Sequence, residues 1–325
     1  MMSLAWLARL PVALFAIPVG LFALAGAWRR ASTFGWSAAP LLAETLGWIA
    51  LAVLALLALL YASKLLRHPQ AVAAEYSHPL ASSLMALLPL AFLLCIVHFG
   101  QPRHAGWLLM LLATLAFMGV VAIRIVALIT TGALPAAAVT PALYIPPVAG
   151  GLVGGMALAV LGYPGWAALL FGMGLISWAL LEMRVLHRLF EGAMPEALRP
   201  TIGVELAPPT IATLSASIIW PQLPADVLLV GLGLTAGPIV AVLARYRWWR
   251  QVPFSPGFWS FSFPVAAMAS CVIEAVRRGG WPPLAGGIAL ALACAIIGFL
   301  LLRTVGLLAR GRLLLPQQAA PAARG

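Results

Sequence analysis

Prolines interrupt every second apolar run of this chain. They are Pro18, Pro89, Pro146 with Pro147, Pro208 with Pro209, and Pro264. Of the five apolar runs between them, only the run with Pro238 has an internal proline. Proline removes a backbone donor and clashes with the carbonyl one turn back, so it bends a helix. Because lipid cannot satisfy the freed carbonyl, the alternation predicts an inner ring of five bent helices and an outer ring of five straighter ones.

The composition places the chain in a membrane. Hydrophobic residues make up 63% and charged residues 8%, against about 25% charged residues in a typical soluble domain. The apolar runs fill residues 11–310, which leaves almost nothing for a soluble domain. We therefore expect an all-α integral membrane protein with one transmembrane domain over residues 1–312 and a disordered tail over 313–325.

A membrane-spanning helix needs about 20 apolar residues. We predict ten spans, at 11–29, 41–66, 80–99, 105–131, 142–161, 164–190, 201–220, 225–245, 257–278 and 284–310. The internal prolines fall at similar depth in the odd-numbered spans, which all run in the same direction. This pattern predicts five helical hairpins in a quasi-fivefold arrangement around a central pore.

The basic residues set the orientation, because cytoplasmic loops carry an excess of Lys and Arg. Thirteen fall on one predicted side: Arg9, Lys64, Arg67, Arg184, Arg188, Arg199, Arg245, Arg247, Arg250, Arg303, Arg310, Arg312 and Arg324. Five fall on the other: Arg29, Arg30, Arg103, Arg277 and Arg278. Both termini are therefore expected in the cytoplasm, and this bias accounts for most of the net charge of +11 without any nucleic-acid partner.

Charged residues within membrane spans are rare and usually functional or paired. Arg124 and Glu182 lie at matching depth in the fourth and sixth spans, so we expect either an ion pair that fixes helix packing or part of a substrate or proton path. Glu205 precedes Pro208 in the seventh span. It is either a hydrogen-bond partner of Arg124 or of freed backbone, or a proton or anion-selectivity group. Glu44 and Glu274 are near span ends and are expected to be solvated or interfacial.

No catalytic constellation is present in the sequence. The three cysteines and five histidines show no metal-ligand spacing, and no phosphate-binding loop occurs. We expect neither an enzyme nor a protein with a cofactor or a metal. The pairs Gly150 with Gly154 and Gly151 with Gly155 either line a pore or let helices approach closely, and we favour close approach.

Several stretches resemble the bacterial TehA tellurite-resistance proteins, whose family of dicarboxylate and TehA transporters includes the slow anion channels of plant guard cells. They are FAIPVGLFALAGAW at 15–28, AEYSHP at 74–79, LYIPPVAG at 143–150, LGYPGWAALLFGMGLISWALLE at 161–182 and FWSFSFP at 258–264. Their order and spacing fit over nearly the whole chain.

The resemblance implies ten helices in five hairpins around a central pore, homotrimeric assembly in the bacterial inner membrane, and small inorganic or organic anions as partners. It also implies a phenylalanine of the ninth helix that plugs the pore. By position this residue is Phe263, beside Pro264, or Phe261 if the register differs by two residues.

The expected function is therefore an anion channel of TehA type. The alternative of the same fold is a proton-coupled transporter of C4-dicarboxylates or tellurite-like oxyanions, with Glu205 as the proton site. An intramembrane enzyme or a passive assembly subunit would show no conductance at all.

Overall fold

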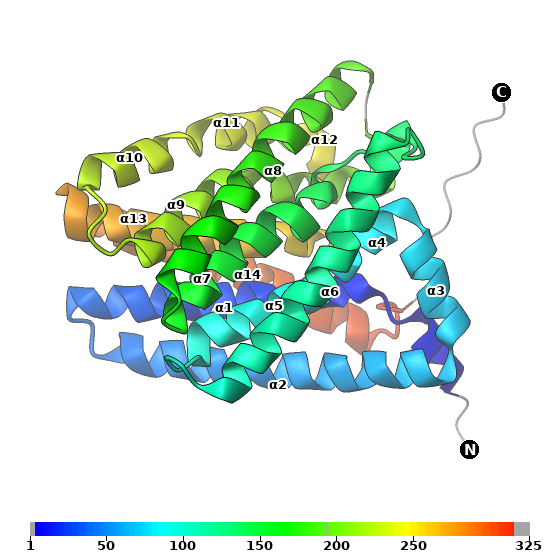
Figure 1. The fold of residues 1–325 in the computed structure, drawn as a ribbon, viewed down its shortest axis with the longest axis horizontal. Coiled ribbons are helices and arrows are strands. Elements are labelled where there is room, and N and C mark those ends of the chain that lie inside the picture. Colours follow the sequence, from blue (N-terminus) through cyan, green and yellow to red (C-terminus); the bar gives the residue numbers. More distant parts are fainter. Residues whose placement is uncertain (1–3, 193, 315–325) are drawn as a thin grey trace.

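The computed structural model describes residues 4–192 and 194–314, and these residues form helices joined by short turns (Figure 1). Of the expected tail at 313–325, residues 315–325 lie outside the described part of the chain. Ten helical stretches are long and apolar enough to cross a membrane, which confirms the predicted number. They are Val12–Phe34, Ala38–Arg67, Pro79–Phe99, Ala105–Thr130, Pro141–Val160, Pro164–Arg188, Glu196–Ile219, Ala225–Ala244, Pro256–Gly279 and Pro283–Ala309.

The even-numbered spans are mostly single α-helices. They are α2 (Ala38–Arg67), α6 (Ala105–Thr130), α8 (Pro164–Phe190), α10 (Ala225–Gly233) with α11 (Ala236–Ala244), and α14 (Pro283–Ala309). The break between α10 and α11 comes just before Pro238, the internal proline of this set. Two short helices, α3 (Pro69–Ser77) and α12 (Tyr246–Arg250), lie in the connections that follow α2 and α11.

In each odd-numbered span, one or two shorter helical pieces precede the main α-helix. The main helices are α1 (Ala16–Ala31), α5 (Leu87–Phe99), α7 (Gly150–Val160), α9 (Ala207–Ile219) and α13 (Ser262–Gly279). The pieces before them are η2 (Val12–Phe15), α4 (Pro79–Met85), η5 and η6 (Pro141–Tyr144 and Ile145–Ala149), η7 (Glu196–Leu206) and η8 (Pro256–Phe261). Of these, α4 is α-helical and η6 is a π-turn, whereas the others are 3₁₀ helices.

The predicted prolines mark the places where these helical pieces meet. Pro18, Pro89 and Pro264 are each the third residue of an α-helix, and Pro208 is the second residue of α9. Pro146 is the second residue of the π-turn. The first turn of a helix tolerates proline because its N–H groups have no intrahelical acceptor. Each proline therefore lies where the helical geometry changes, rather than within an uninterrupted α-helix.

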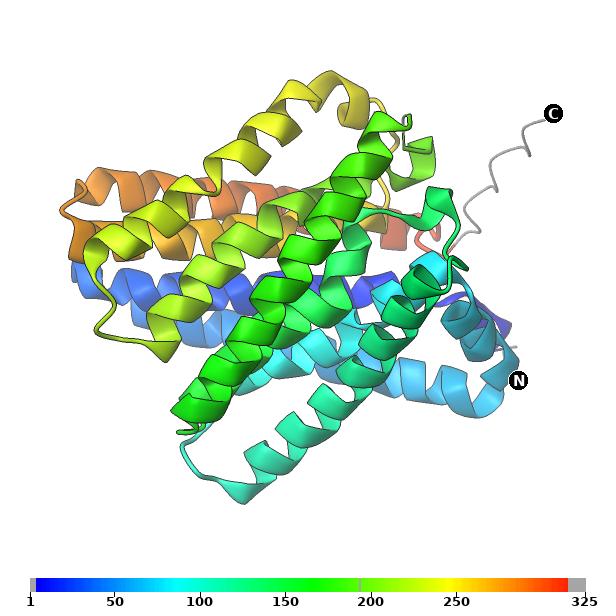
Figure 2. The ribbon, with the colours of Figure 1, turned by 45° about the horizontal axis from the view of Figure 1, so that its top comes forward.

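Burial separates the two sets of spans. In the odd-numbered spans 67–83% of the most apolar window is buried, whereas in the even-numbered spans the share is 17–28%. The straight rods of α6 and α8 accordingly lie at the front of the bundle in two views (Figure 1 and Figure 2). The proline-bearing spans are thus the inner ones, as the sequence predicts, and the outer spans present apolar side chains to the surroundings.

The inner helices contact one another in a closed cycle. Helix α1 packs against α5 and α13, α7 packs against α5 and α9, and α9 packs against α13. Each inner helix also packs against the outer helix that follows it in the chain, as α1 does with α2 and α13 with α14.

The closest approach of an inner and an outer helix depends on glycine. A Cβ atom at Gly151 of α7 would lie 2.5 Å from the Cα of Gly174 in α8 and 2.6 Å from its backbone nitrogen. These separations are shorter than van der Waals contact, and the obstacle is backbone rather than a flexible side chain. The favoured interpretation of Gly151, that it allows two helices to approach, is therefore confirmed.

We predict that Gly151→Ala destabilises the protein, because α7 and α8 must move apart to admit the methyl group. Overpacking of this kind typically costs about 1–3 kcal/mol. Gly172→Ala in α8 is the matched control, since a Cβ atom there would meet no neighbour within 4 Å among the described residues. Thermal unfolding in detergent, followed by tryptophan fluorescence, should show a lower midpoint for Gly151→Ala only. Equal midpoints for the two variants would contradict the close-approach assignment.

Candidate functional site

A cavity of about 90 Å³ lies among the inner helices, and we call it the central cavity. Every residue that lines it belongs to an odd-numbered span, and all five of these spans contribute. Representative lining residues are Val19, Leu90, Val148, Ile211 and Phe263. The central cavity therefore lies on the axis that the five proline-bearing spans surround.

The lining of the central cavity is apolar, and its few hydroxyl groups donate to other acceptors. Tyr144 Oη donates to Glu182 Oε2 at 2.7 Å, Thr201 Oγ1 to the Leu198 carbonyl at 2.7 Å, and Ser260 Oγ to the Pro200 carbonyl at 2.5 Å. Apolar cavities of this size stay dry because water finds no polar partners in them. The central cavity is thus a poor environment for a hydrated ion.

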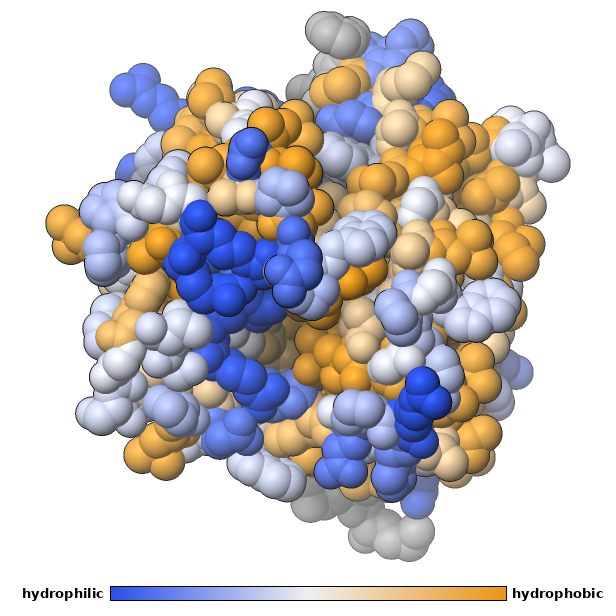
Figure 3. Space-filling view, turned by 60° about the vertical axis from the view of Figure 1, so that its left-hand side comes forward, coloured by the Kyte–Doolittle hydropathy of each residue, from blue (hydrophilic) through white to orange (hydrophobic). Residues whose placement is uncertain are grey.

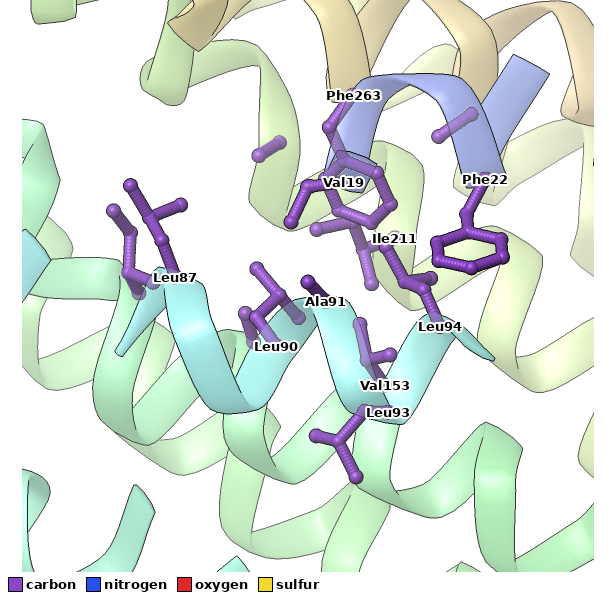
Figure 4. Close-up of a cluster of buried hydrophobic side chains, with 14 of the residues drawn as sticks. Val19, Phe22, Leu87, Leu90, Ala91, Leu93, Leu94, Val153, Ile211 and Phe263 are labelled. Carbon is purple, nitrogen blue, oxygen red and sulfur yellow. The ribbon is translucent and has the colours of Figure 1, made fainter. Parts of the chain in front are cut away.

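Phe263 lies at one boundary of this cavity. It is the second residue of α13, directly before Pro264, and only 7% of its surface is exposed. Figure 4 shows its ring near Val19 of α1 and Ile211 of α9, with Leu94 of α5 beside them. The structure thus brings Phe263 together with side chains from other inner helices.

Phe261, the alternative two residues earlier, has a different environment. Its ring packs against Trp249 with centroids 5.1 Å apart and stacks on Phe258 at 6.5 Å. It does not line the central cavity. The two phenylalanines therefore differ in position enough for each to serve as a control for the other.

A second, charged cavity of about 450 Å³ lies at the end of the inner helices where α1 and α13 finish, and we call it the mouth cavity. Its charged lining residues are Arg29, Arg30, Glu274, Arg277 and Arg278. Figure 3 shows this end of the molecule, where hydrophilic residues gather beside a hollow. All five odd-numbered spans contribute to the mouth cavity, as they do to the central cavity.

The two cavities are separated by about one helical turn. On α1, Val19 lines the central cavity and Phe22 lines the mouth cavity. On α5, the corresponding residues are Leu90 and Leu94. Three or four residues of α-helix rise about 5 Å. The apolar cluster of Figure 4 lies where the two cavities adjoin, since its Val19 and Phe263 line the central cavity and its Phe22 and Leu94 line the mouth cavity.

The importance of Glu274 is missed by the sequence reasoning, which places it in solvent or at the interface. It is 6% exposed, and its Oε2 accepts from Arg277 Nη2 at 2.5 Å and from Arg278 Nε at 2.8 Å. Its Oε1 lies 3.6 Å from Arg30 Nε. The signal was available, because an acid followed by arginines three and four residues later places all three on one helix face. Glu44 is half-exposed, as expected for an interfacial residue, and pairs with Arg29 at 2.7 Å.

Arg124 and Glu182 have separate partners, so the expected ion pair is not formed. Arg124 donates from Nη2 to the Ser77 carbonyl at 3.2 Å, and its guanidinium lies 4.5 Å from the centre of the Tyr76 ring. Glu182 accepts from Tyr144 and from Trp178 Nε1. Similar depth in two helices does not place two residues on facing sides, and here each residue has aromatic partners of its own.

Glu205 pairs with Arg245 rather than with Arg124. Its Oε2 accepts from Arg245 Nη2, and its Oε1 lies 3.4 Å from Arg245 Nη1. Both residues line a lateral cavity of about 630 Å³, together with Glu182 and Trp248. The sequence does not reveal this partner, because Arg245 is the last residue of its predicted span and is considered only for the orientation of the chain.

Residues of α3 contact the neighbouring helices α2 and α6. Glu75 of α3 accepts from Tyr61 Oη at 2.7 Å and from Lys64 Nζ at 2.6 Å, both on α2. The adjacent Tyr76 and Ser77 contact Arg124 of α6, as described above. Lys64 is only 1% exposed and also donates to the Leu10 carbonyl at 2.8 Å. Among the residues that the structure describes, no group of three or more His, Cys, Asp or Glu could hold a metal ion.

Two comparisons with known proteins agree with one another. Residues 9–308 match the family described as voltage-dependent anion channel, SLAC1. The chain is also 30% identical over 311 residues to the tellurite resistance protein TehA homolog of Haemophilus influenzae. That alignment covers 94% of this chain and 93% of the relative.

We predict that Glu205 and Arg245 are energetically coupled. Glu205→Gln or Arg245→Gln leaves one partly buried charge without its partner, and the double variant removes both charges. Contacting charged residues typically show coupling of about 0.5–3 kcal/mol. In a double-mutant cycle measured by chemical unfolding in detergent, the double variant should lose less stability than the two single variants together. Additive losses would show that the contact contributes nothing.

Proposed function

This chain belongs to the SLAC1 family of voltage-dependent anion channels, and from that premise we propose that it is a channel for passive permeation of small monovalent anions, closed by the side chain of Phe263. The observation that carries the proposal is the order of the two cavities along the inner helices. The mouth cavity and the central cavity follow one another along the inner helices, the apolar cluster of Figure 4 lies where they adjoin, and the same five spans line both cavities. The proposed arrangement is five hairpins with quasi-fivefold symmetry around one pore.

Closure of this pore follows from dewetting. A narrow segment lined by hydrocarbon excludes water, and an ion cannot enter without its hydration shell or a polar substitute. Phe263 lines the central cavity and belongs to the same apolar cluster as Phe22, which lines the mouth cavity. Its position beside Pro264 allows a small change in the helix to move the ring away from the axis.

Channel activity fits the polar groups better than proton-coupled transport of a dicarboxylate or a tellurite-like oxyanion does. A coupled carrier needs a titratable group that faces the path. Among the described residues no carboxylate lines the central cavity, and Glu205 lines the lateral cavity while bound to Arg245. The inner-span carboxylate that faces the path is Glu274, which lies among arginines at the mouth. These arginines favour anions over cations.

We further propose that the protein is a homotrimer in a bacterial inner membrane with both termini in the cytoplasm. The excess of basic residues on the side of the termini supports this orientation. The mouth cavity would then open to the outside of the cell. The even-numbered spans expose many large apolar side chains, such as Leu109, Ile123 and Leu180, which fits contact with lipid or with neighbouring subunits.

We predict that Phe263→Ala converts a nearly silent protein into one with a measurable anion current. Loss of the ring widens and wets the apolar segment, so chloride or nitrate passes. Planar bilayer recordings of purified wild type and variant, with the sodium salts of chloride, nitrate and malate, provide the measurement.

Phe261→Ala is the matched control, because it removes the same ring from the same helical region outside the central cavity. It should leave the current at the wild-type level. If Phe263 only fills the core, its removal should instead cost about 3–5 kcal/mol and lower the melting temperature without any new current. That result would refute the proposed closure.

We also predict a trimer in mild detergent. Native mass spectrometry should record three copies of the 34.1 kDa chain. A monomer in every detergent and lipid mixture tested would reject this assembly, whereas the proposed pore, which lies within one chain, would stand.

A further inference from the structure

The mouth cavity has more positive than negative side chains. Arg29, Arg30, Arg277 and Arg278 line it, and Glu274 is its lining carboxylate. Glu44 lies beside it and pairs with Arg29. Four guanidinium groups therefore face two carboxylates. The carbonyl ends of the inner helices offset part of this excess, and some of them accept hydrogen bonds from the arginines, as the Ser217 carbonyl does from Arg278.

The decisive observation concerns hydrogen bonds rather than net charge. Arg30 Nε is buried and has no hydrogen-bond acceptor among the described residues, because Glu274 Oε1 is 3.6 Å away. A buried charged donor without an acceptor is costly. Arg277 directs Nε and Nη2 to Glu274, and no hydrogen bond from its Nη1 is present in the described part of the chain. Donors of two arginines therefore remain available beside one shared carboxylate.

We propose that the mouth cavity binds a planar oxyanion, a nitrate or a small carboxylate, against Arg30 and Arg277, and that Glu274 competes with it as a built-in carboxylate. Guanidinium groups present paired N–H donors in one plane, which matches the two oxygens of a planar oxyanion better than a spherical halide. The arginines already hold one such group, since Glu274 itself is a carboxylate. An incoming anion uses the donors of Arg30 and Arg277 that Glu274 leaves free, and it is repelled by the charge of Glu274.

This inference rests on the proposed function only for its place on the permeation path, because binding can be measured without any current. The probe is the thermal unfolding midpoint of the purified full-length protein in detergent. Sodium nitrate, sodium formate or sodium chloride replaces sodium fluoride at constant ionic strength. Nitrate and formate should raise the midpoint at lower concentration than chloride does. Equal effects of chloride and nitrate would overturn the planar-oxyanion class.

Four variants locate the site. Glu274→Gln should lower the half-effective concentration of nitrate by roughly tenfold, because one nearby repulsive charge is removed. Arg30→Gln and Arg277→Gln should each raise the half-effective concentration of nitrate by roughly tenfold, because each removes one positive charge that attracts the anion. Arg103→Gln is the matched control, since Arg103 is an exposed arginine at the same end that does not line the mouth cavity. This variant should change the half-effective concentration of nitrate by less than about twofold, because salt screens charges that are exposed to solvent.

The gain expected for Glu274→Gln cannot result from misfolding, so it remains informative if an arginine variant is unstable. Unchanged or weaker nitrate binding by Glu274→Gln would overturn the competition. Current through Phe263→Ala without any effect of nitrate on unfolding would reject the mouth site and leave the channel proposal intact. Nitrate binding with no current in any variant would reject the channel proposal and leave the mouth site intact.

Discussion

The need to satisfy every backbone polar group away from lipid organises this protein. Where a proline separates two helical pieces, carbonyls at the end of the first piece lack the donors that a continuous helix would supply, and hydrocarbon offers no substitute. The five spans that carry such prolines are therefore enclosed by five that mostly do not, and their burial differs accordingly, at 67–83% against 17–28%. In each inner span the proline lies near the junction of two helical pieces, which is a 3₁₀ or π-helical piece followed by an α-helix in all but the span of Pro89. Residues at these junctions, such as Ala16, Leu87, Ala149, Ala207 and Phe263, all line the central cavity.

The same constraint explains where the polar chemistry lies. Hydroxyl groups near the centre donate to carbonyls or to Glu182, so they are not available to an ion in the central cavity. The charged side chains collect at the two ends of the inner helices and at the lateral cavity. The division into an apolar middle and a basic mouth is therefore a consequence of packing bent helices together, and it is the reason why we place the proposed anion site at the mouth.

The sequence predicted the ten spans, the inner and outer sets and the family, because these depend on composition, on proline spacing and on motifs in a fixed order. It did not predict side-chain pairs between helices. Arg124 and Glu182 have similar depth, but depth does not determine the direction in which a side chain points around its helix. Glu205 pairs with Arg245, which directly follows α11 and is considered in the sequence only for the orientation of the chain. Glu274 was the exception, because its arginines lie on its own helix and their spacing alone could have revealed the cluster.

The 3₁₀ segment before α13 has a geometric consequence for the residue that follows it. A 3₁₀ helix turns 120° per residue and rises about 2.0 Å, whereas an α-helix turns 100° and rises 1.5 Å. Rewinding the six residues Pro256–Phe261 into α geometry would shorten this piece by about 3 Å and rotate everything after it by about 120°. In such a rewinding, a short axial displacement at one end of the span would be coupled to a rotation of the Phe263 ring by about a third of a turn.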